Sequence, residues 1–427
     1  MKKALAVLLI ALVAMTSVFA NGGAEDTSAD GTTTLTWAIW DYATTPYYDA
    51  LINAYEASHP DVNVEVIDLG SADYQTALQI QLSGGGSEFD VVAVKDIPGY
   101  NNLVKAGLLV DLAPLAEADG LDTSVYGGIV EQVSVGDSFY ELPFRSDFWV
   151  VFYNKDLFDA AGVPYPTNDM TFEEYDAIAR QMTSGSGASK VYGAHYHTWR
   201  SAIQLFGILD GKHQITDGGD YSYLKPYYEM ALAEQADGIV QDYATLKTSN
   251  IHYSGVFYNE SVAMENMGSW FIATLIAATN DGTNDATNWG IVKYPHAEGV
   301  EPGTTLGTIT ALAIPTGTDQ QDAAWDFVKF VCGEEGAKAL AGTGNFPALT
   351  NDAINDIIAS TPGFPQDEQS KEALNVAQLY LEMPLHDKSA EIEVVLNEYH
   401  DQIMTGNMSV DEGLAEMGRR VDEVLAN

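Results

Sequence analysis

The stretch YELPFRSDFWVVFYNKDLF, residues 140–158, places an ionisable Arg145-Ser146-Asp147 triplet directly before a six-residue apolar run, Phe148 to Tyr153. A continuous run of this kind, rich in β-branched and aromatic residues, is typical of a buried strand. Buried charges persist only when they are paired or hydrogen-bonded. The triplet is therefore expected to have polar partners, either in an internal ion pair or in a polar ligand held where two parts of the protein meet.

The N-terminal residues have the pattern of a secretory signal peptide, which we assign to residues 1–20. Two lysines precede an apolar stretch at residues 4–14, and the sequence VFA at residues 18–20 provides a cleavage site. The apolar stretch is shorter than the roughly 20 residues that a membrane-spanning helix needs. The single cysteine, Cys332, is far from this region, so no lipobox cysteine is expected. We expect the protein to be released into the periplasm.

Composition limits the partners of the chain. Its 427 residues are enough for two or three domains, and we expect two. The formal net charge of −42 disfavours binding to nucleic acid or to anionic lipid. An apolar content of 46% with 11% aromatic residues is that of a folded protein, not of a disordered acidic tail.

After a small, polar and acidic leash at residues 21–31, strands and helices are predicted to alternate. Strands are expected at residues 34–39, 62–66 and 89–94, separated by a helix at 46–58 and a second helix capped by Ser71. This order predicts an α/β fold with a mainly parallel sheet covered by helices.

In such sheets, ligands lie beyond the carboxyl ends of the strands. That rule selects the loops Trp40-Asp41, Leu69-Gly70-Ser71 and Lys95-Asp96. Further along the chain the pattern predicts a helix at 155–161, a helix opened by a Thr171–Glu174 capping box, a helix near 224–236, a strand at 309–314, a helix at 321–340 and a terminal helix at 409–425.

Several segments together resemble extracellular solute-binding protein family 1, the maltose-binding-protein-like substrate-binding proteins of ABC sugar importers. The matching segments are WAIW (37–40), FDVVAVKD (89–96), YELPF (140–144), YNKDLFDAAGVPYP (153–166) with the following TFEEY, AMENMGSW (263–270) and LAIPTGTDQQDAAWDFVKF (312–330). Each segment alone is a weak signal, whereas the set is quite specific.

The resemblance implies a two-lobe periplasmic binding protein fold of type II, in which two lobes with mainly parallel sheets are joined by hinge strands. It implies crossings between the lobes near residues 144–148 and 292–296. The N-terminal lobe would comprise residues 32–145 plus 296–345, and the C-terminal lobe residues 146–295 plus 346–427. It also places Trp40, Asp41, Lys95 and Asp96 on the first-lobe rim, Asp147 at the hinge and Trp270 on the second-lobe wall.

A pyranose presents hydroxyls around its edge and C–H groups on its faces, so its recognition needs flat apolar surfaces together with fixed polar groups. Trp40, Trp199 and Trp270 are our candidates for stacking, whereas Trp37, Trp149 and Trp325 lie in apolar periodic segments and are expected in the core. The candidate edge-binding residues are Asp41, Asp96, Arg145 and Asp147. A guanidinium group would also admit an acidic sugar such as a uronate.

The segment His195-Tyr196-His197 is compatible with a metal site, because alternation on a strand puts both imidazoles on one face. The sequence supplies no third ligand in a recognisable pattern, so we expect no metal and no cofactor. A ligand-facing wall of Tyr196, His197, Trp199 and Arg200 is the preferred reading, and ordinary packing is the alternative. Gly268 allows close backbone approach just before Trp270.

The leading hypothesis is a non-catalytic, monomeric periplasmic receptor that binds a mono- or oligosaccharide between closing lobes and delivers it to ABC transporter permease subunits. One alternative is a secreted glycoside hydrolase, which needs a pair of cleft carboxylates that 61 acidic residues can supply unseen. Another is a solute receptor for a membrane sensor kinase.

Overall fold

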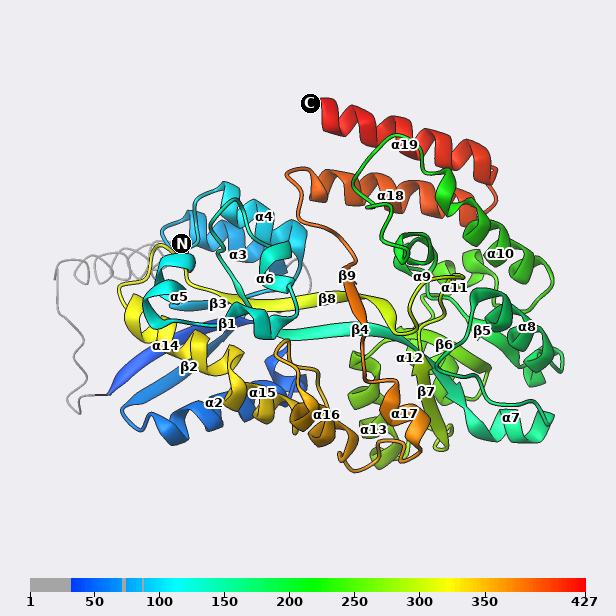
Figure 1. Cartoon of the computed structure of the whole chain (residues 1–427), viewed down its shortest axis with the longest axis horizontal. Coiled ribbons are helices and arrows are strands. Elements are labelled where there is room, and N and C mark those ends of the chain that lie inside the picture. The colour runs from blue at the N-terminus through cyan, green and yellow to red at the C-terminus, as the bar shows by residue number, and fades with distance from the viewer. Residues whose placement is uncertain (1–31, 71–73, 87) are drawn as a thin grey trace, which may run out of the picture.

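The structure is a computed structural model that describes residues 32–70, 74–86 and 88–427 (Figure 1). The predicted signal peptide, the leash and Ser71 lie outside the described residues. The strands are β1 (Thr33–Ile39), β2 (Val62–Asp68), β3 (Val91–Val94), β4 (Leu142–Asn154), β5 (Tyr192–His195), β6 (Val262–Gly268), β7 (Trp289–Lys293), β8 (Thr304–Ala313) and β9 (Gln378–Leu381).

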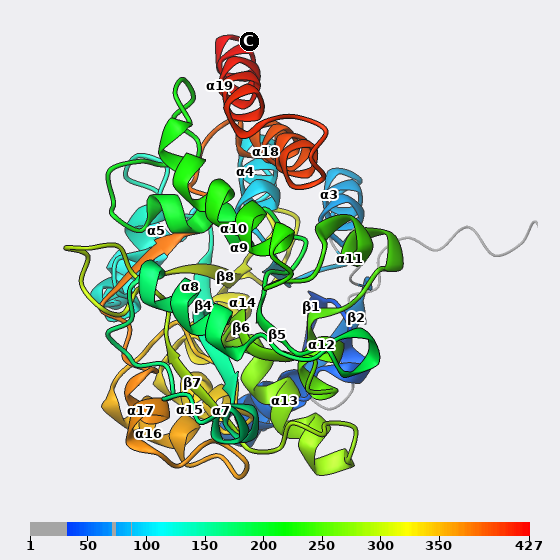
Figure 2. The same cartoon turned by 90° about the vertical axis from the view of Figure 1, so that its right-hand side faces the viewer.

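Helices surround these strands on all sides (Figures 1 and 2). They are α2 (Tyr47–Ser58), α3 (Tyr74–Ser83), α4 (Ile97–Lys105), α5 (Ala113–Asp119), α6 (Ile129–Gln132), α7 (Lys155–Ala161), α8 (Phe172–Met182), α9 (Ser201–Gln204), α10 (Lys225–Ala236), α11 (Tyr243–Ser249), α12 (Tyr253–Tyr258), α13 (Trp270–Asp281), α14 (Gln321–Cys332), α15 (Glu334–Ala341), α16 (Asp352–Ala359), α17 (Glu368–Glu372), α18 (Ser389–Met404) and α19 (Val410–Ala426). Within the described ranges, no helix has both the length and the apolar character needed to cross a bilayer.

The first lobe confirms the predicted β-α-β-α-β order. Strand β1 pairs in parallel with β2 on one side and with β3 on the other. The predicted capping box of Thr171 and Glu174 is present at the start of α8. The predicted helix at 321–340 is interrupted at Gly333, which separates α14 from α15.

Strand β4 connects the two lobes and confirms the buried strand predicted from the quoted stretch. Its first half pairs with β8 as far as Phe148, and from Trp149 onward it pairs with β6 and β7. Strand β8 runs antiparallel beside β4 across the junction, so two adjacent strands cross between the lobes (Figure 1). Strand β9 pairs in parallel with the first part of β8, from Thr304 to Gly307.

Two expectations about the sheets need correction. The second crossing is made by β8, later than the predicted residues 292–296, because Val292 lies in β7 and pairs with Val151 inside the second lobe. The sheets are also mixed instead of mainly parallel: among the described strands of the second lobe the β5–β6 pair is parallel, whereas β4 is antiparallel to β6 and β7. The reason is that β4 runs from the first lobe into the second, whereas its neighbours β6 and β7 run in the opposite direction.

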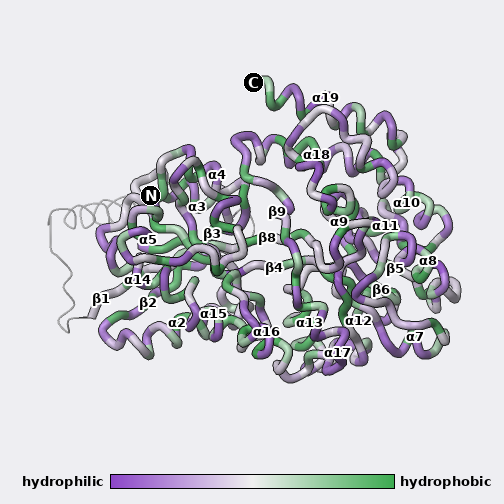
Figure 3. Tube along the Cα trace, in the orientation of Figure 1, coloured by the Kyte–Doolittle hydropathy of each residue, from purple (hydrophilic) through white to green (hydrophobic). Residues whose placement is uncertain are grey.

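Three apolar clusters fill the molecule. One lies in the first lobe around Trp37. The other two lie on opposite faces of the second-lobe sheet, because odd positions from Trp149 to Tyr153 face one cluster and even positions from Phe148 to Phe152 face the other. Outer helices such as α19 alternate between hydrophilic and hydrophobic residues (Figure 3).

Buried ionisable groups in the second lobe give stability a predictable pH dependence. Burial lowers the pKa of both His195 and His400 to about 3. As pH drops below 6.5, these histidines take up protons in the unfolded chain but not in the folded one, so the free energy of unfolding falls. Burial raises the pKa of Glu234 to about 8, so the unfolded chain ionises first and stability falls as pH rises from 4.5 towards 8. The two effects oppose each other between pH 4.5 and 6.5.

Because two histidines outweigh one glutamate below pH 6.5, we expect the free energy of unfolding to be highest near pH 6.5 and to decline on both sides, as measured by urea unfolding across pH 3 to 9. Glu234→Gln should flatten the alkaline decline, because one group with this shift contributes about 1.4 kcal/mol per pH unit at most. Exposed Glu229→Gln on the same helix is the control, with an unchanged profile. A Glu234→Gln profile identical to that of the wild type would contradict this assignment.

Candidate functional site

One face of β4 carries Arg145, Asp147 and Trp149 in alternation at the junction of the lobes. The Arg145 Nε lies 3.3 Å from Asp147 Oδ2, and its Nη2 donates to Thr310 Oγ1 at 3.2 Å. Asp147, only 2% exposed, also accepts a hydrogen bond from Ser269 Oγ at 2.9 Å. The internal ion pair considered from sequence is therefore present, and it is hydrogen-bonded on both sides.

The Asp147 carboxyl is held between opposing influences. Burial raises its pKa, whereas the Arg145 guanidinium and the Ser269 hydroxyl lower it. The guanidinium carbon of Arg145 also lies 5.5 Å from the ring centroid of Tyr47, which belongs to the first lobe. This contact ties the hinge to the first-lobe helix α2.

An aromatic wall, which we define as Trp149, Trp199 and Trp270, adjoins this polar centre in the second lobe. The ring centroid of Trp149 lies 5.9 Å from that of Trp270 and 6.4 Å from that of Trp199. Trp149 is buried, as the sequence predicted, whereas Trp199 is 38% exposed and Trp270 is half-buried. The wall is thus a buried indole supporting two indoles that reach the surface. His197 and Tyr253 pack edge-on against Trp199.

Gly268 makes room for this wall. It lies directly opposite Trp149 in the β4–β6 pair, and a Cβ atom there would lie only 2.0 Å from Cζ3 of Trp270. The Trp270 ring can therefore lie over Gly268 only while that position has no side chain. This is the close approach that the sequence suggested.

Replacing Gly268 with alanine is expected to displace the Trp270 indole and to destabilise the protein by about 1–3 kcal/mol, a typical cost of overpacking. The measurements are thermal unfolding and the near-ultraviolet circular dichroism of the coupled indoles. Gly255→Ala in α12 is the matched control, because a Cβ atom at that position would meet no neighbouring atom within 4 Å. An unchanged indole spectrum in Gly268→Ala would refute the close approach.

The first-lobe rim brings together the residues selected at the ends of β1 and β3. The Lys95 Nζ lies 5.3 Å from the ring centroid of Trp40, which packs against Tyr74. Asp41 adopts a left-handed conformation with φ of 53°, and its N–H donates to Asp68. Asp96 caps α4 by accepting from the Gly99 N–H at 2.7 Å. These positions confirm that the strand ends converge.

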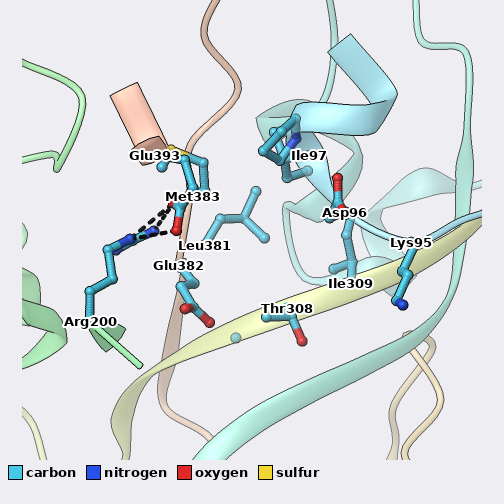
Figure 4. A pocket seen from close by; sticks show the side chains of 12 residues that line it. Lys95, Asp96, Ile97, Arg200, Thr308, Ile309, Leu381, Glu382, Met383 and Glu393 are labelled. Carbon is cyan, nitrogen blue, oxygen red and sulfur yellow. Dashed lines mark hydrogen bonds and ion pairs between the residues drawn. The ribbon is translucent and has the colours of Figure 1, made fainter. Parts of the chain in front are cut away.

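A cavity of about 270 Å³ lies between the first-lobe rim and the second lobe (Figure 4). Its lining comes from the β3–α4 junction, from β8, from the end of β9 and the segment after it, from Arg200 before α9 and from the start of α18. The lining residues are Lys95, Asp96, Ile97, Pro98, Arg200, Gly307, Thr308, Ile309, Leu381, Glu382, Met383 and Glu393.

The cavity adjoins the polar face of β4, because Asp147 lies directly opposite Thr308 in the antiparallel β4–β8 pair. Side chains of residues paired in this way project from the same face of a sheet. We use the term cleft for this cavity together with the polar face of β4 and the aromatic wall. The cleft joins residues from both lobes and from both hinge strands.

Arg200 lies at the second-lobe side of the cavity and is bound to a residue that the sequence analysis did not identify. Its Nε donates to both carboxylate oxygens of Glu393 at 2.9 Å, and its Nη2 donates to Glu393 Oε2 at 2.5 Å. Its Nη1 contacts Gln204 Oε1 at 3.4 Å. The guanidinium group is almost wholly buried by these contacts.

The structure places the predicted site residues around the cleft, with the exception of Tyr196. Trp40, Lys95, Asp96 and Arg200 lie at or beside the cavity, and Asp41 lies on the first-lobe rim. Arg145 and Asp147 lie at the hinge, and His197, Trp199, Gly268 and Trp270 lie along the aromatic wall. Tyr196 does not belong to the wall, because its ring is buried in the core near Tyr175 and Phe206. Alternation along the chain sends Tyr196 and His197 to opposite sides.

The cavity residues that the sequence analysis did not identify include Thr308, Glu382, Met383 and Glu393. The last of these lies on α18, a helix that the sequence analysis did not predict. The periodic positions Ile392, Val395, Leu396 and Tyr399, all buried in the structure, were a signal that could have revealed it.

His195 and His197 do not form a recognisable metal centre. Among residues 32–70, 74–86 and 88–427, no group of three or more His, Cys, Asp or Glu side chains is arranged to hold a metal ion. Burial lowers the pKa of His197 to about 4, so its imidazole is neutral at pH 7. Gly218 and Gly219, between Asp217 and Asp220, both have positive φ.

Similarity to known proteins extends over most of the chain. The profile of the family described as bacterial extracellular solute-binding protein matches residues 43–338. A solved sugar transporter from Rhizobium etli, in an open conformation, is 53% identical and superposes with a TM-score of 0.86, covering 92% of this chain and 99% of its own.

Two further proteins are more distant. An ABC substrate-binding protein from Listeria monocytogenes, solved in complex with cycloalternan, is 21% identical with a TM-score of 0.75, covers 92% of this chain and 99% of its own, and shares the fold. A mannitol-binding protein from Pseudomonas aeruginosa is 23% identical over 345 residues, which are 75% of this chain and 74% of its own.

Proposed function

Because the chain belongs to the bacterial extracellular solute-binding proteins, we propose that it binds a mono- or oligosaccharide between its two lobes and delivers it to the permease of an ABC transporter. The observation that carries this proposal is the aromatic wall beside the hydrogen-bonded Asp147 at the hinge. The related sugar transporter and the mannitol-binding protein support the same class of ligand.

The chemistry of the cleft suits a sugar. Trp199 and Trp270 offer indole faces to the C–H face of a pyranose, and their rigid rings lose little entropy on binding. Asp96 and Asp147 offer carboxylate oxygens to hydroxyls at the ring edge, where charge-assisted hydrogen bonds are strong. Micromolar affinity needs only about −8 kcal/mol.

The other predicted residues complete the proposed site. Trp40 and Asp41 form the outer first-lobe rim with Lys95. His197 supports Trp199 from behind, and Gly268 gives Trp270 its place. Arg145 and Arg200 hold carboxylates at the hinge and at the second-lobe side of the cavity, respectively.

The lobes are proposed to close on the ligand by bending at β4 and β8. We divide the chain into a first lobe of residues 32–145 plus 308–345 and a second lobe of 146–307 plus 346–427, with the boundary moved to β8. Leu306 packs in a second-lobe cluster and Ile309 in the first-lobe cluster, which supports this boundary. A ligand favours closure only by binding the closed state more tightly, which contacts from both lobes provide.

Membership of an extracellular family places the protein outside the cytoplasm. We further propose a periplasmic, non-catalytic monomer that is secreted through a cleaved signal peptide and carries no lipid anchor. The sensor-kinase alternative shares the same site and differs only in the membrane partner.

A melting-shift screen against a carbohydrate panel tests the binding proposal. A sugar at 100 times its dissociation constant adds about 2.7 kcal/mol to the free energy of unfolding, so the melting temperature should rise for at least one sugar. No shift across the whole panel would reject carbohydrate as the ligand class. Incubation with oligosaccharides and an assay for new reducing ends tests the hydrolase alternative, in which turnover would overturn the receptor assignment.

A further inference from the structure

Five ionisable side chains line the cavity, and carboxylates outnumber cations among them. They are Lys95, Asp96, Arg200, Glu382 and Glu393. Arg200, Glu382 and Glu393 gather on one side of the cavity, and Lys95 and Asp96 lie on the other (Figure 4). With two cations against three carboxylates, the lining is acidic, as is the whole chain with its net charge of −42.

Each cation beside the cleft already has a carboxylate neighbour. Arg200 binds Glu393 through two nitrogens. At the hinge, Arg145 lies 3.3 Å from Asp147 and donates to Thr310. Lys95 is adjacent in sequence to Asp96, and its charge lowers the pKa of that carboxyl against the raising effect of burial.

Glu382 is the third carboxylate of the lining, beyond the two that neighbour Lys95 and Arg200. It follows β9 and faces the cavity beside Arg200. Burial raises its pKa above the ordinary value, and the Arg200 charge offsets this only in part. Arg200 thus lies near two carboxylates. Its Nε and Nη2 already donate to one of them, that of Glu393. A carboxylate on a guest would have to displace Glu393 and would then share the cavity with both glutamates.

We infer that the cleft selects sugars without negative charge, and that Glu382 and Glu393 are the specificity-determining residues that exclude uronates and sugar phosphates. The inference rests on the proposed sugar-binding function and decides the class of sugar, because a guanidinium group alone would admit an acidic one. Specificity built by placing unpaired or like charges against the wrong ligand is a general device. A neutral sugar can accept hydrogen bonds from Lys95 and donate hydroxyl protons to the carboxylates without disturbing any ion pair.

The test measures binding by calorimetry for matched pairs: glucose and glucuronate, galactose and galacturonate, mannose and mannuronate, and galactobiose and digalacturonate. The wild type is expected to bind the neutral member of at least one pair at least tenfold more tightly than its acidic partner. A uronate that binds equally well or better would overturn the inference. Binding of none of these sugars, together with a silent carbohydrate screen, would instead reject the proposed function.

The variants Glu382→Gln and Glu393→Gln then identify the residues responsible. Each variant should reduce the preference for the neutral sugar, measured as the ratio of the two dissociation constants, by about tenfold. We take the removal of one like charge as one tenfold step in affinity, which corresponds to about 1.4 kcal/mol. Exposed Glu398→Gln on α18 is the control, with an unchanged ratio. Glu393→Gln removes the partner of Arg200 and can prevent folding. In that case Glu382→Gln alone tests whether a glutamate of the lining excludes acidic sugars. An unchanged ratio in every folded glutamine variant would overturn the assignment to these glutamates.

Discussion

Replacing Trp270 with alanine is expected to weaken sugar binding at least thirtyfold, the largest loss of affinity that we predict for any single substitution. Trp270 is half-buried, packs edge-on against Trp149 and lies within 6.2 Å of the ring centroid of Trp199. Truncating an indole at the centre of a binding surface typically costs about 2 kcal/mol or more, which corresponds to that factor in Kd. Calorimetric titration with the sugar found by melting shift measures the effect.

The control for Trp270→Ala is Trp325→Phe, a change at an indole of the first lobe. Trp325 is buried in the first-lobe cluster, donates from Nε1 to Asp119 and does not line the cavity. Its replacement should lower stability slightly and leave Kd unchanged. A folded Trp270→Ala protein with wild-type affinity would remove the aromatic wall from the binding site.

Replacing Asp147 with alanine is expected to lower the free energy of unfolding by about 3–5 kcal/mol, because it leaves the largely buried Arg145 without its partner. Urea unfolding measures the loss. The double variant Arg145→Met/Asp147→Leu should recover most of it, since apolar replacement of a buried pair is often neutral. Neither variant should bind sugar tightly, because both remove the carboxylate that we propose to bind the ring edge.

An exposed ion pair provides the comparison for Asp147→Ala. Lys338 and Glu334 lie one turn apart on α15 with side chains 40% and 63% exposed, and Glu334→Ala should cost less than about 1 kcal/mol. If Asp147→Ala were equally mild, the hinge pair would be solvated, and its proposed role in recognition would lose support.

The local pattern of the sequence was sufficient to predict the first-lobe sheet and the hinge strand. Alternation at Val62, Val64 and Val66 and the apolar run after Asp147 each depend on neighbouring residues only, so periodicity captures them. The loops at the ends of β1 and β3 followed from a general rule about parallel sheets, and Trp40 and Asp96 are indeed brought to one rim.

Other features depend on contacts between distant segments and could not be predicted from local pattern. Both β7 and β8 pair with β4, and only the register of that pairing decides which one crosses between the lobes. Tyr196 and His197 are adjacent just beyond β5, and only the packing of the folded chain decides which of them faces the aromatic wall. Glu393 enters the cavity from α18, nearly 200 residues after Arg200.

The most direct measurement of this account is the crystal structure of the protein with the sugar that gives the largest melting shift. We expect the sugar ring to stack on Trp270 or Trp199, with ring-edge hydroxyls bonded to Asp96 or Asp147 and no displacement of Glu393 from Arg200. A sugar bound instead on the opposite side of β4, in the cavity of about 360 Å³ lined by Phe148, Phe346 and Asn355, would contradict it.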